Sequence, residues 1–289
     1  MMERFPVSGE LALAGEFVGP ADAPVVLFLH GGGQTRHAWR ATARMIARHG
    51  FRTLCVDQRG HGDSDRDPSR RYDMDLFAGD VRALLASIPG VTSIIGASLG
   101  GMASLIALGD RAQQTGRPSL VLVDIAHRME PGGVAEIKGF MAAHLDGFAT
   151  VDDAADAIAA YLPHRVRRSG TEGLMRNLRQ SEDGLLRWHW DPAFITSGLD
   201  RPTFSTERLT RAASRLRCPV LLIRGGESRV VSESAAAEFL TIVPTARLVT
   251  IGNAHHMVAG DDNHAFNEPL LAFLQSTDTG KQVAENMHG

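Results

Sequence analysis

Ser98 is the centre of a Gly-Ala-Ser-Leu-Gly segment, where an apolar run at residues 91–95 gives way to a helical pattern. The flanking glycines leave room for a strained backbone and for close packing of a strand against a helix, so this serine would stand at the tip of a sheet. A hydroxyl nucleophile is presented in this way. A structural turn serine is the alternative, and we favour the nucleophile because its partners also fall where one would need them.

A serine hydroxyl is a poor nucleophile at neutral pH unless a neighbouring base takes its proton. The chain contains 12 histidines. His256 is the best placed, because its loop follows the last predicted strand, residues 248–251, and emerges at the same sheet edge as Ser98. Its neighbour His255 is the competing candidate, which we interpret as a hydrogen-bonded loop histidine. We therefore predict that His256 is the general base.

Three further segments complete a pattern: a His-Gly-Gly-Gly run at residues 30–33, Trp39, and a charged turn at residues 57–64. Together with the serine turn and the late histidine, they resemble the landmarks of the α/β-hydrolase family over nearly the whole chain. The resemblance is closest to the lidded branch, which contains esterases, epoxide hydrolases, haloalkane dehalogenases and carbon-carbon bond hydrolases. Since the dehalogenases and epoxide hydrolases of that family use an aspartate nucleophile, Ser98 argues against those two chemistries.

The glycine run after His30 offers unhindered backbone donors. We expect the N–H groups of Gly32 and Leu99 to form an oxyanion hole, in which each pre-aimed donor contributes about 3 kcal/mol. An ordinary glycine turn is the alternative. We interpret His30 as a hydrogen-bonded scaffold residue. Residues 57–64 resemble the hydrogen-bonded brace of the family, with Arg59 paired inside the loop.

The third member of such a site is a carboxylate that holds the histidine in the correct tautomer. In many relatives it follows the strand predicted here at residues 220–223, but Arg229 stands at the expected position. Two carboxylates could compensate: Asp124, at the end of the predicted strand 120–123, and Glu227, in the loop that lacks the usual acid. We prefer Asp124, because a strand end fixes a side chain better than a loop does. Without an acid partner the enzyme would be slow.

Short apolar runs alternate with longer helical patterns, which predicts an α/β fold with a mostly parallel central sheet and helices on both faces. The predicted strands are residues 25–29, 53–56, 91–95, 120–123, 220–223 and 248–251, with an antiparallel hairpin edge at 11–18. The predicted core helices are residues 38–49, 75–87, 99–109, 232–243 and 265–275.

Residues 126–215 break this alternation and have helical patterns only, at 134–145, 151–161, 172–178 and 206–216. We expect an all-helical cap, inserted between sheet strands and lying over the carboxyl ends of the parallel strands. The predicted organisation is a hydrolase core at 1–125, the cap at 126–215, the rest of the core at 216–276 and a flexible tail at 277–289.

Trp188 and Trp190 give the cap a large apolar surface with polar edges. Such side chains pack either in a cap core or against substrate, and we expect one of the two to face the cavity. Gly33 and Met257 complete the predicted substrate pocket, beside the oxyanion loop and the base.

Composition limits the class of partner. The chain has 289 residues, 44% of them apolar, and a net charge of −3, so there is no electrostatic case for nucleic acid or an anionic membrane. Cys55 and Cys218 are the only cysteines, which we interpret as free core thiols in a reducing compartment. No signal peptide or membrane-length apolar run is evident. We expect a cytoplasmic monomer or homodimer that binds a small-molecule substrate and needs no cofactor or metal.

These residues predict a serine hydrolase that cleaves a carboxylic ester or lactone through an acyl-enzyme. Two alternatives stay open. Carbon-carbon bond hydrolysis or perhydrolysis would use the same residues. A catalytically decayed small-molecule binding protein is the second alternative, because Arg229 occupies the usual acid position. The identity of the substrate does not follow from these patterns.

Overall fold

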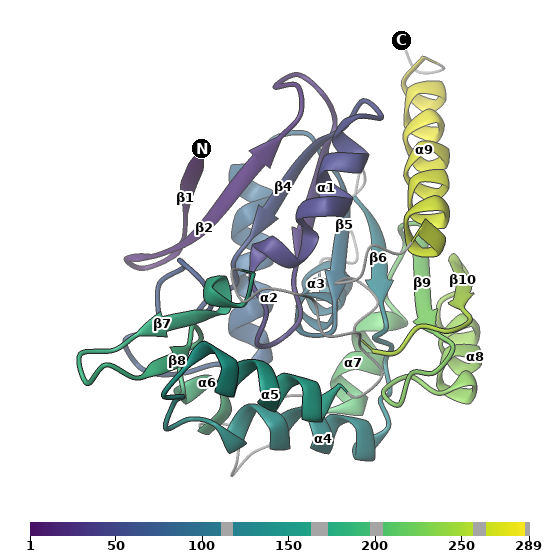
Figure 1. The fold of residues 1–289 in the computed structure, drawn as a ribbon. Helices are drawn as coiled ribbons and strands as arrows, with labels where there is room; N and C mark the ends of the chain where they lie inside the picture. The colour runs from purple at the N-terminus through teal and green to yellow at the C-terminus, as the bar shows by residue number, and fades with distance from the viewer. Residues whose placement is uncertain (111–117, 163–172, 197–204, 257–263, 287–289) are drawn as a thin grey trace.

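An eight-stranded sheet runs through the centre of the protein and carries helices on both faces (Figure 1). The computed structural model describes residues 1–110, 118–162, 173–196, 205–256 and 264–286. In spatial order the strands are β1 (Met2–Ser8), β2 (Leu11–Val18), β4 (Arg52–Val56), β3 (Val25–Leu29), β5 (Val91–Ala97), β6 (Ser119–Val123), β9 (Val220–Gly225) and β10 (Ala246–Ile251). The pairs from β4 to β10 are parallel, whereas β1 and β2 form an antiparallel edge. The predicted α/β class and hairpin edge are confirmed.

The apolar runs form strands because both faces of the sheet are covered. All five residues of β3 are buried. Val25, Leu27 and Leu29 pack into one core, and Val26 and Phe28 pack into the other. A strand buried on both faces needs a continuous apolar run rather than an alternating one, which is the pattern that the sequence has.

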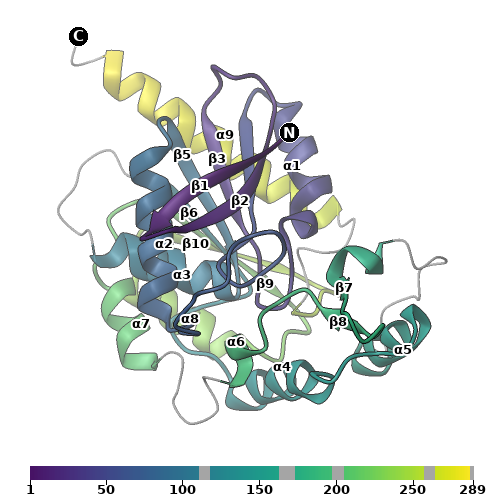
Figure 2. The same cartoon turned by 90° about the vertical axis from the view of Figure 1, so that its left-hand side faces the viewer.

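Two layers of helices enclose the sheet (Figure 2). On one face lie α1 (Arg40–Ala47), which follows a 3-10 turn η1 (Arg36–Trp39), and α9 (His264–Asn286); on the other lie α2 (Met74–Ser87), α3 (Leu99–Asp110), α7 (Thr206–Ala213) and α8 (Glu233–Ile242). α9 runs from His264 to Asn286. The flexible tail expected at 277–289 remains a prediction.

The carboxyl ends of the parallel strands are covered by the cap (Figure 1). Its described elements are α4 (Pro131–Ala143), α5 (Val151–Tyr161), η2 (Leu174–Asn177), β7 (Leu178–Gln180), β8 (Leu186–Trp188) and α6 (Ala193–Thr196), and they share a small apolar core of their own. β7 and β8 form an antiparallel hairpin, so the cap is largely but not entirely helical. We missed the hairpin signal of Asp183-Gly184: Gly184 has a φ of +84°, which suits a tight turn.

α7 belongs to the core rather than to the cap in which its residues were expected. It packs against α3 so closely that a Cβ on Gly109 would lie 2.3 Å from the carbonyl oxygen of Ala212. The described part of the cap is therefore the segment that begins with α4 and ends with α6. The limits 126–215 remain a prediction.

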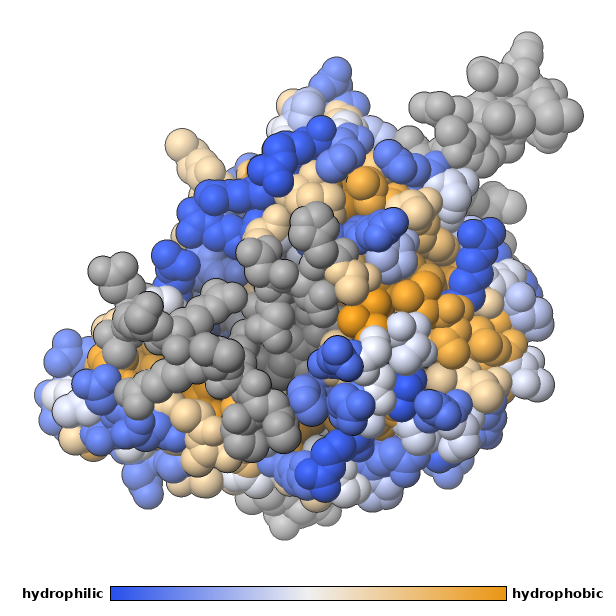
Figure 3. Space-filling view, turned by 45° about the vertical axis from the view of Figure 1, so that its right-hand side comes forward, coloured by the Kyte–Doolittle hydropathy of each residue, from blue (hydrophilic) through white to orange (hydrophobic). Residues whose placement is uncertain are grey.

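On the face of the molecule that carries β10, a band of apolar residues is visible among polar ones (Figure 3). β10 is the edge strand of the sheet, and its Leu248 is 37% exposed. Within the described ranges, none of the helices combines the length and the apolar character that a bilayer crossing requires.

Candidate active site

Ser98 stands on a strained turn between β5 and α3. Its φ is +42°, a conformation that side-chain-bearing residues rarely adopt. A Cβ on Gly96 would lie 2.6 Å from the carbonyl of Gly100, and a Cβ on Gly100 would lie 2.6 Å from Leu29 Cβ. The glycines that the sequence places around the serine are therefore required by close packing. Such strain points to a functional site.

Asp124 is the second residue of this edge with a positive φ, +49°. It follows β6 directly, as Ser98 follows β5, and the register of the two strands sets Ala97 opposite Val123. The backbone N–H of Ser98 donates to the Val123 carbonyl over 3.3 Å. The serine and the carboxylate therefore begin from neighbouring points of the same sheet edge.

The carboxylate of Asp124 is fully buried and accepts three hydrogen bonds. Oδ1 accepts the Gly225 N–H at 3.0 Å, while Oδ2 accepts the Ser228 hydroxyl at 2.5 Å and the Nδ1–H of His256 at 2.7 Å. A buried carboxylate needs such donors, because desolvation without them is costly. The bond at Nδ1 leaves Nε2 of His256 as the nitrogen for a reacting group.

The role of Ser228 was not predicted from the sequence, because this serine belongs to no motif and is notable only as the neighbour of Arg229. Its Oγ accepts the N–H groups of Val230 and Val231, each at 3.1 Å. Because the oxygen receives these two donors, its own proton is directed at Asp124. Ser228 therefore donates to Oδ2 of Asp124, while the backbone N–H of Gly225 donates to Oδ1.

Glu227 and Arg229 lie apart from this hydrogen-bonded group. Glu227 is exposed, and its backbone N–H donates to the Ala254 carbonyl at 3.0 Å. Arg229 forms a 2.8 Å ion pair with Glu136 of α4, in which both side chains are largely exposed. His256 thus meets Asp124 and not the alternative Glu227, and Arg229 links the core to the cap.

One backbone N–H in the loop after β3 and one at the start of α3 have no acceptor among the described residues. The Gly31 N–H donates to Gln34 Oε1 at 3.0 Å, and the Gly33 N–H donates to His61 Nε2 at 3.1 Å. The N–H groups of Gly32 and Leu99 make no hydrogen bond to any described residue. Leu99 opens α3, so its N–H has no intrahelical acceptor. Gly31 is close to Ser98, because a Cβ built on it would lie 3.5 Å from the serine Cβ.

A row of three buried histidines lies behind this loop. The ring centroids of His30 and His61 are 5.2 Å apart, and those of His61 and His189 are 5.8 Å apart. Burial lowers the pKa of His30 to about 4 and that of His61 to about 3, and it lowers the pKa of His189 well below its usual value. All three rings are therefore neutral near pH 7.

His30 is hydrogen-bonded on both ring nitrogens, as a scaffold residue would be. Its Nδ1–H donates to the Gly31 carbonyl at 2.8 Å, and its Nε2 accepts the Gln58 N–H at 2.9 Å. These bonds join the glycine loop to the charged turn that follows β4.

The charged turn is a brace, but one of its expected pairings is wrong. Asp57 is buried and forms an ion pair with Arg36. Arg59 reaches beyond the turn: it forms bonds of 2.6 and 2.5 Å to Asp80 of α2 and one of 2.9 Å to Asp67. A buried guanidinium pairs best with a carboxylate that accepts two parallel hydrogen bonds from it, as Asp80 does here. A carboxylate in the same tight loop could not adopt this geometry.

Three apolar cap side chains cover the glycine loop. A Cβ on Gly32 would lie 3.3 Å from the ring of Phe194, and one on Gly33 would lie 2.9 Å from Met141 Cε and 3.4 Å from Trp190. Trp188 stacks behind Trp190 at 4.9 Å, within the cap core. Trp190 is thus the tryptophan that contacts the glycine loop, and the expectation that one of the two faces substrate remains a prediction. Phe194 and Met141 belong to no motif and were missed.

Met257, the remaining predicted pocket residue, lies outside the described residues. In the part of the chain that the structure describes, no three His, Cys, Asp or Glu side chains are arranged to hold a metal ion.

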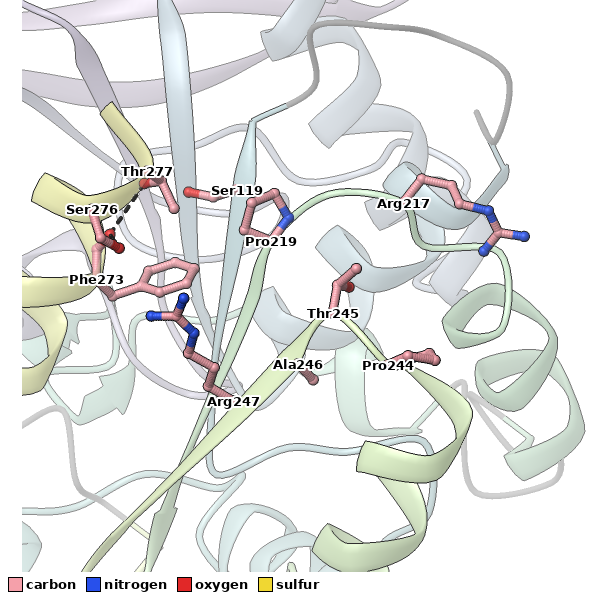
Figure 4. A pocket seen from close by; sticks show the side chains of 10 residues that line it. All are labelled: Ser119, Arg217, Pro219, Pro244, Thr245, Ala246, Arg247, Phe273, Ser276 and Thr277. Atoms are coloured by element: carbon pink, nitrogen blue, oxygen red, sulfur yellow. Dashed lines mark hydrogen bonds between the residues drawn. The ribbon is translucent and has the colours of Figure 1, made fainter. Parts of the chain in front are cut away.

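A second concave region lies at the opposite edge of the sheet, where β6, β9 and β10 begin (Figure 4). This groove has a volume of about 620 Å³ and is lined by Ser119, Arg217, Pro219, Pro244, Thr245, Ala246, Arg247, Phe273, Ser276 and Thr277. Figure 4 shows the guanidinium of Arg217 pointing away from the other side chains. None of the predicted site residues lines the groove, so it is separate from the candidate active site.

Known proteins are similar to this chain over most of its length. The pattern that defines the alpha/beta hydrolase fold matches residues 24–262. An esterase of Mycobacterium tuberculosis is 31% identical over 262 residues, which cover 88% of this chain and 84% of that protein. A bifunctional esterase/perhydrolase of Acinetobacter calcoaceticus is 26% identical over 272 residues, covering 89% of this chain and 94% of that one.

Solved structures show the same architecture. The crystal structure of E-2-(acetamidomethylene)succinate hydrolase is similar with a TM-score of 0.79 at 24% identity, covering 95% of this chain and 99% of that one. At this identity the likeness concerns the fold alone. The family match covers far more than half of the chain, and its relatives include esterases and other hydrolases. The protein therefore belongs to the α/β-hydrolase fold family and is a hydrolase.

Proposed function

We propose that the protein is a serine hydrolase that cleaves a carboxylic ester or lactone, with Ser98 as nucleophile, His256 as general base and Asp124 as acid. The observation that carries the proposal is the 2.7 Å hydrogen bond between His256 Nδ1 and the buried carboxylate of Asp124. This pair lies at the sheet edge from which the strained Ser98 turn projects.

In acylation, Ser98 Oγ attacks the carbonyl carbon while its proton passes to His256 Nε2. The resulting oxyanion accepts hydrogen bonds from the N–H groups of Gly32 and Leu99, which are otherwise unused by the described residues. Collapse expels the alcohol, which takes the proton from His256 and leaves an acyl ester on Ser98. Water then repeats the sequence, with His256 as base, and releases the carboxylic acid. Asp124 stabilises the imidazolium that forms in each half.

The choice of an ester rests on the chain's similarity to the mycobacterial esterase and on the lining of the loop. Phe194, Met141 and Trp190 cover Gly32 and Gly33 with apolar surface. We expect this apolar surface to favour a short apolar acyl group over a charged one.

Replacement of the nucleophile tests the proposal. Ser98→Ala is expected to abolish hydrolysis of short acyl p-nitrophenyl esters and labelling by a fluorophosphonate, because no other hydroxyl would be activated by His256. Ser87→Ala, at the end of α2, is the matched control and should retain both. An Ser98→Ala variant with unchanged activity and labelling would reject the assignment.

Perhydrolysis and carbon-carbon bond hydrolysis remain alternatives, since they use the same residues. The similarity to a bifunctional esterase/perhydrolase favours the former. Formation of peracetic acid from acetate and hydrogen peroxide, faster than hydrolysis of any ester, would favour it further. Rapid loss of the visible absorbance of a ring-cleavage dienoate would favour carbon-carbon cleavage instead. A wild-type protein that binds these compounds without turnover would favour the decayed binding protein.

A further inference from the structure

The cap reaches the glycine loop through one polar side chain. His189 follows β8, and its Nε2–H donates to the carbonyl of Gly33 at 3.2 Å. Its Nδ1 accepts the N–H of Gly62 at 2.8 Å. The ring is buried and neutral, so one of its nitrogens can donate while the other accepts. It thereby bridges the glycine loop and the charged turn. No other cap side chain makes a hydrogen bond to residues 30–33 among those described.

Gly33 is held from its other side by the core. Its N–H donates to Nε2 of His61, whose Nδ1–H donates to the carbonyl of Arg59 at 3.0 Å. The two peptide units that flank the Gly33 Cα are therefore fixed by two histidines, one from the core and one from the cap. Gly33 has a φ of +75°, so its conformation is one that glycine adopts freely and that needs external support to stay unique.

The segment that carries His189 is itself fastened to the core. The Asp191 N–H donates to the Gly60 carbonyl at 2.8 Å, and the Tyr72 hydroxyl donates to Asp191 Oδ2 at 2.7 Å. Both Tyr72 and Asp191 are buried. Residues 189–191 are thus part of the scaffold of the loop and do more than cover it.

We propose that His189 is a positioning residue of the oxyanion hole: it holds the 33–34 peptide through the Gly33 carbonyl and, together with His61 on the 32–33 peptide, restrains the loop conformation that orients the Gly32 N–H. This inference rests on the proposed function. According to this inference, the cap helps to position a donor of the oxyanion hole, in addition to any role in substrate choice. A displaced donor loses much of its effect on a developing oxyanion, because hydrogen-bond strength depends on distance and angle.

Two substitutions separate the bonds that His189 makes. In His189→Gln the amide nitrogen takes the place of Nε2 and can still donate to the Gly33 carbonyl. In His189→Asn the amide oxygen takes the place of Nδ1 and can still accept from Gly62, but the side chain is too short to reach Gly33. Both variants remove the imidazole ring and with it the edge-to-face contact with Trp190.

We expect His189→Asn to lower kcat for p-nitrophenyl acetate by about tenfold or more, with KM changed by less than about twofold, because a misplaced oxyanion donor weakens binding of the transition state more than binding of the substrate. The rate of fluorophosphonate labelling of Ser98 should fall in parallel. His189→Gln should recover most of both. The control is Arg179→Gln, which removes the 2.9 Å pair between the same hairpin and Asp63 without touching Gly33. It should keep the wild-type kcat.

The contrary results are distinct. If Asn and Gln variants lose thermal stability but keep the wild-type kcat and labelling rate, His189 is only a packing residue and the inference is wrong. Equal loss of kcat in both would also reject it. Nitrogen-15 NMR of the histidines in the wild-type protein needs no variant: His189 must be the Nε2–H tautomer and His61 the Nδ1–H tautomer, and the opposite result for His189 would reject the bond. A wild-type protein without esterase activity would instead reject the proposed function.

Discussion

The acid side and the oxyanion side of the candidate site are held by different parts of the molecule. Asp124 receives its hydrogen bonds from Gly225, the last residue of β9, from Ser228 in the loop after β9 and from His256 in the loop after β10. Gly33 is held by His61 from the core and by His189 from the cap. A change in the cap should therefore reach the oxyanion loop first and leave the carboxylate and histidine in place.

The largest effect should come from the acid side. Asp124→Asn removes the charge that stabilises the imidazolium, and it favours the wrong tautomer of His256, so kcat/KM at pH 7 should fall by about 10³-fold or more. Glu227→Gln is the matched control and should stay within about twofold, since Glu227 is exposed and does not contact His256. Steady-state kinetics on one ester measure both. Equal activity of the two variants would show that neither carboxylate is the partner of His256.

A smaller effect is expected from Ser228, which acts only through Asp124. Ser228→Ala removes the 2.5 Å bond to the carboxylate, worth about 1.5–3 kcal/mol for a charged acceptor, and kcat should fall by about tenfold. Ser228→Thr keeps the hydroxyl and should restore most of the rate. Labelling and kinetics at several pH values separate this from a loss of folded protein. If Thr is no better than Ala, the hydroxyl does not position Asp124.

The oxyanion side should have its own dependence on pH. Burial holds the pKa of His30 at about 4 and that of His61 at about 3, below the 6.5 of a free histidine. The unfolded chain therefore binds more protons below pH 6.5, and stability should fall as the pH drops from 6.5 toward 4 and be flat above it. Each of these histidines contributes up to about 1.4 kcal/mol per pH unit in this window.

His61→Gln should reduce the dependence of the free energy of unfolding on pH by the contribution of one histidine. Chemical denaturation between pH 4 and 8 measures this. The groups whose charges act on His61 are His30, Asp57 and Asp191, and all three remain in the variant. His49→Gln, at an exposed position, is the control. A slope that His61→Gln leaves unchanged would mean that His61 is charged in the folded protein.

Much of the fold could be predicted from the sequence because its signals are local. Apolar runs such as β3 must be strands when both faces are covered. The tight strand-to-helix turn at Ser98 could be predicted because glycines stand two residues on either side of it. The hairpin of β7 and β8 was not predicted, since it depends on a single Asp-Gly turn.

The sequence by itself determined the strand-to-helix turn at Ser98, the alternation that makes the sheet, and the place of a histidine loop after the last strand. Only the tertiary structure decided that His256 bonds to Asp124 rather than to Glu227, because β6, β9 and β10 are neighbours in the sheet but distant in the chain. It also decided that His189, Phe194 and Met141 from the cap contact the glycine loop. Contacts between segments so far apart depend on packing, which no local pattern of residues records.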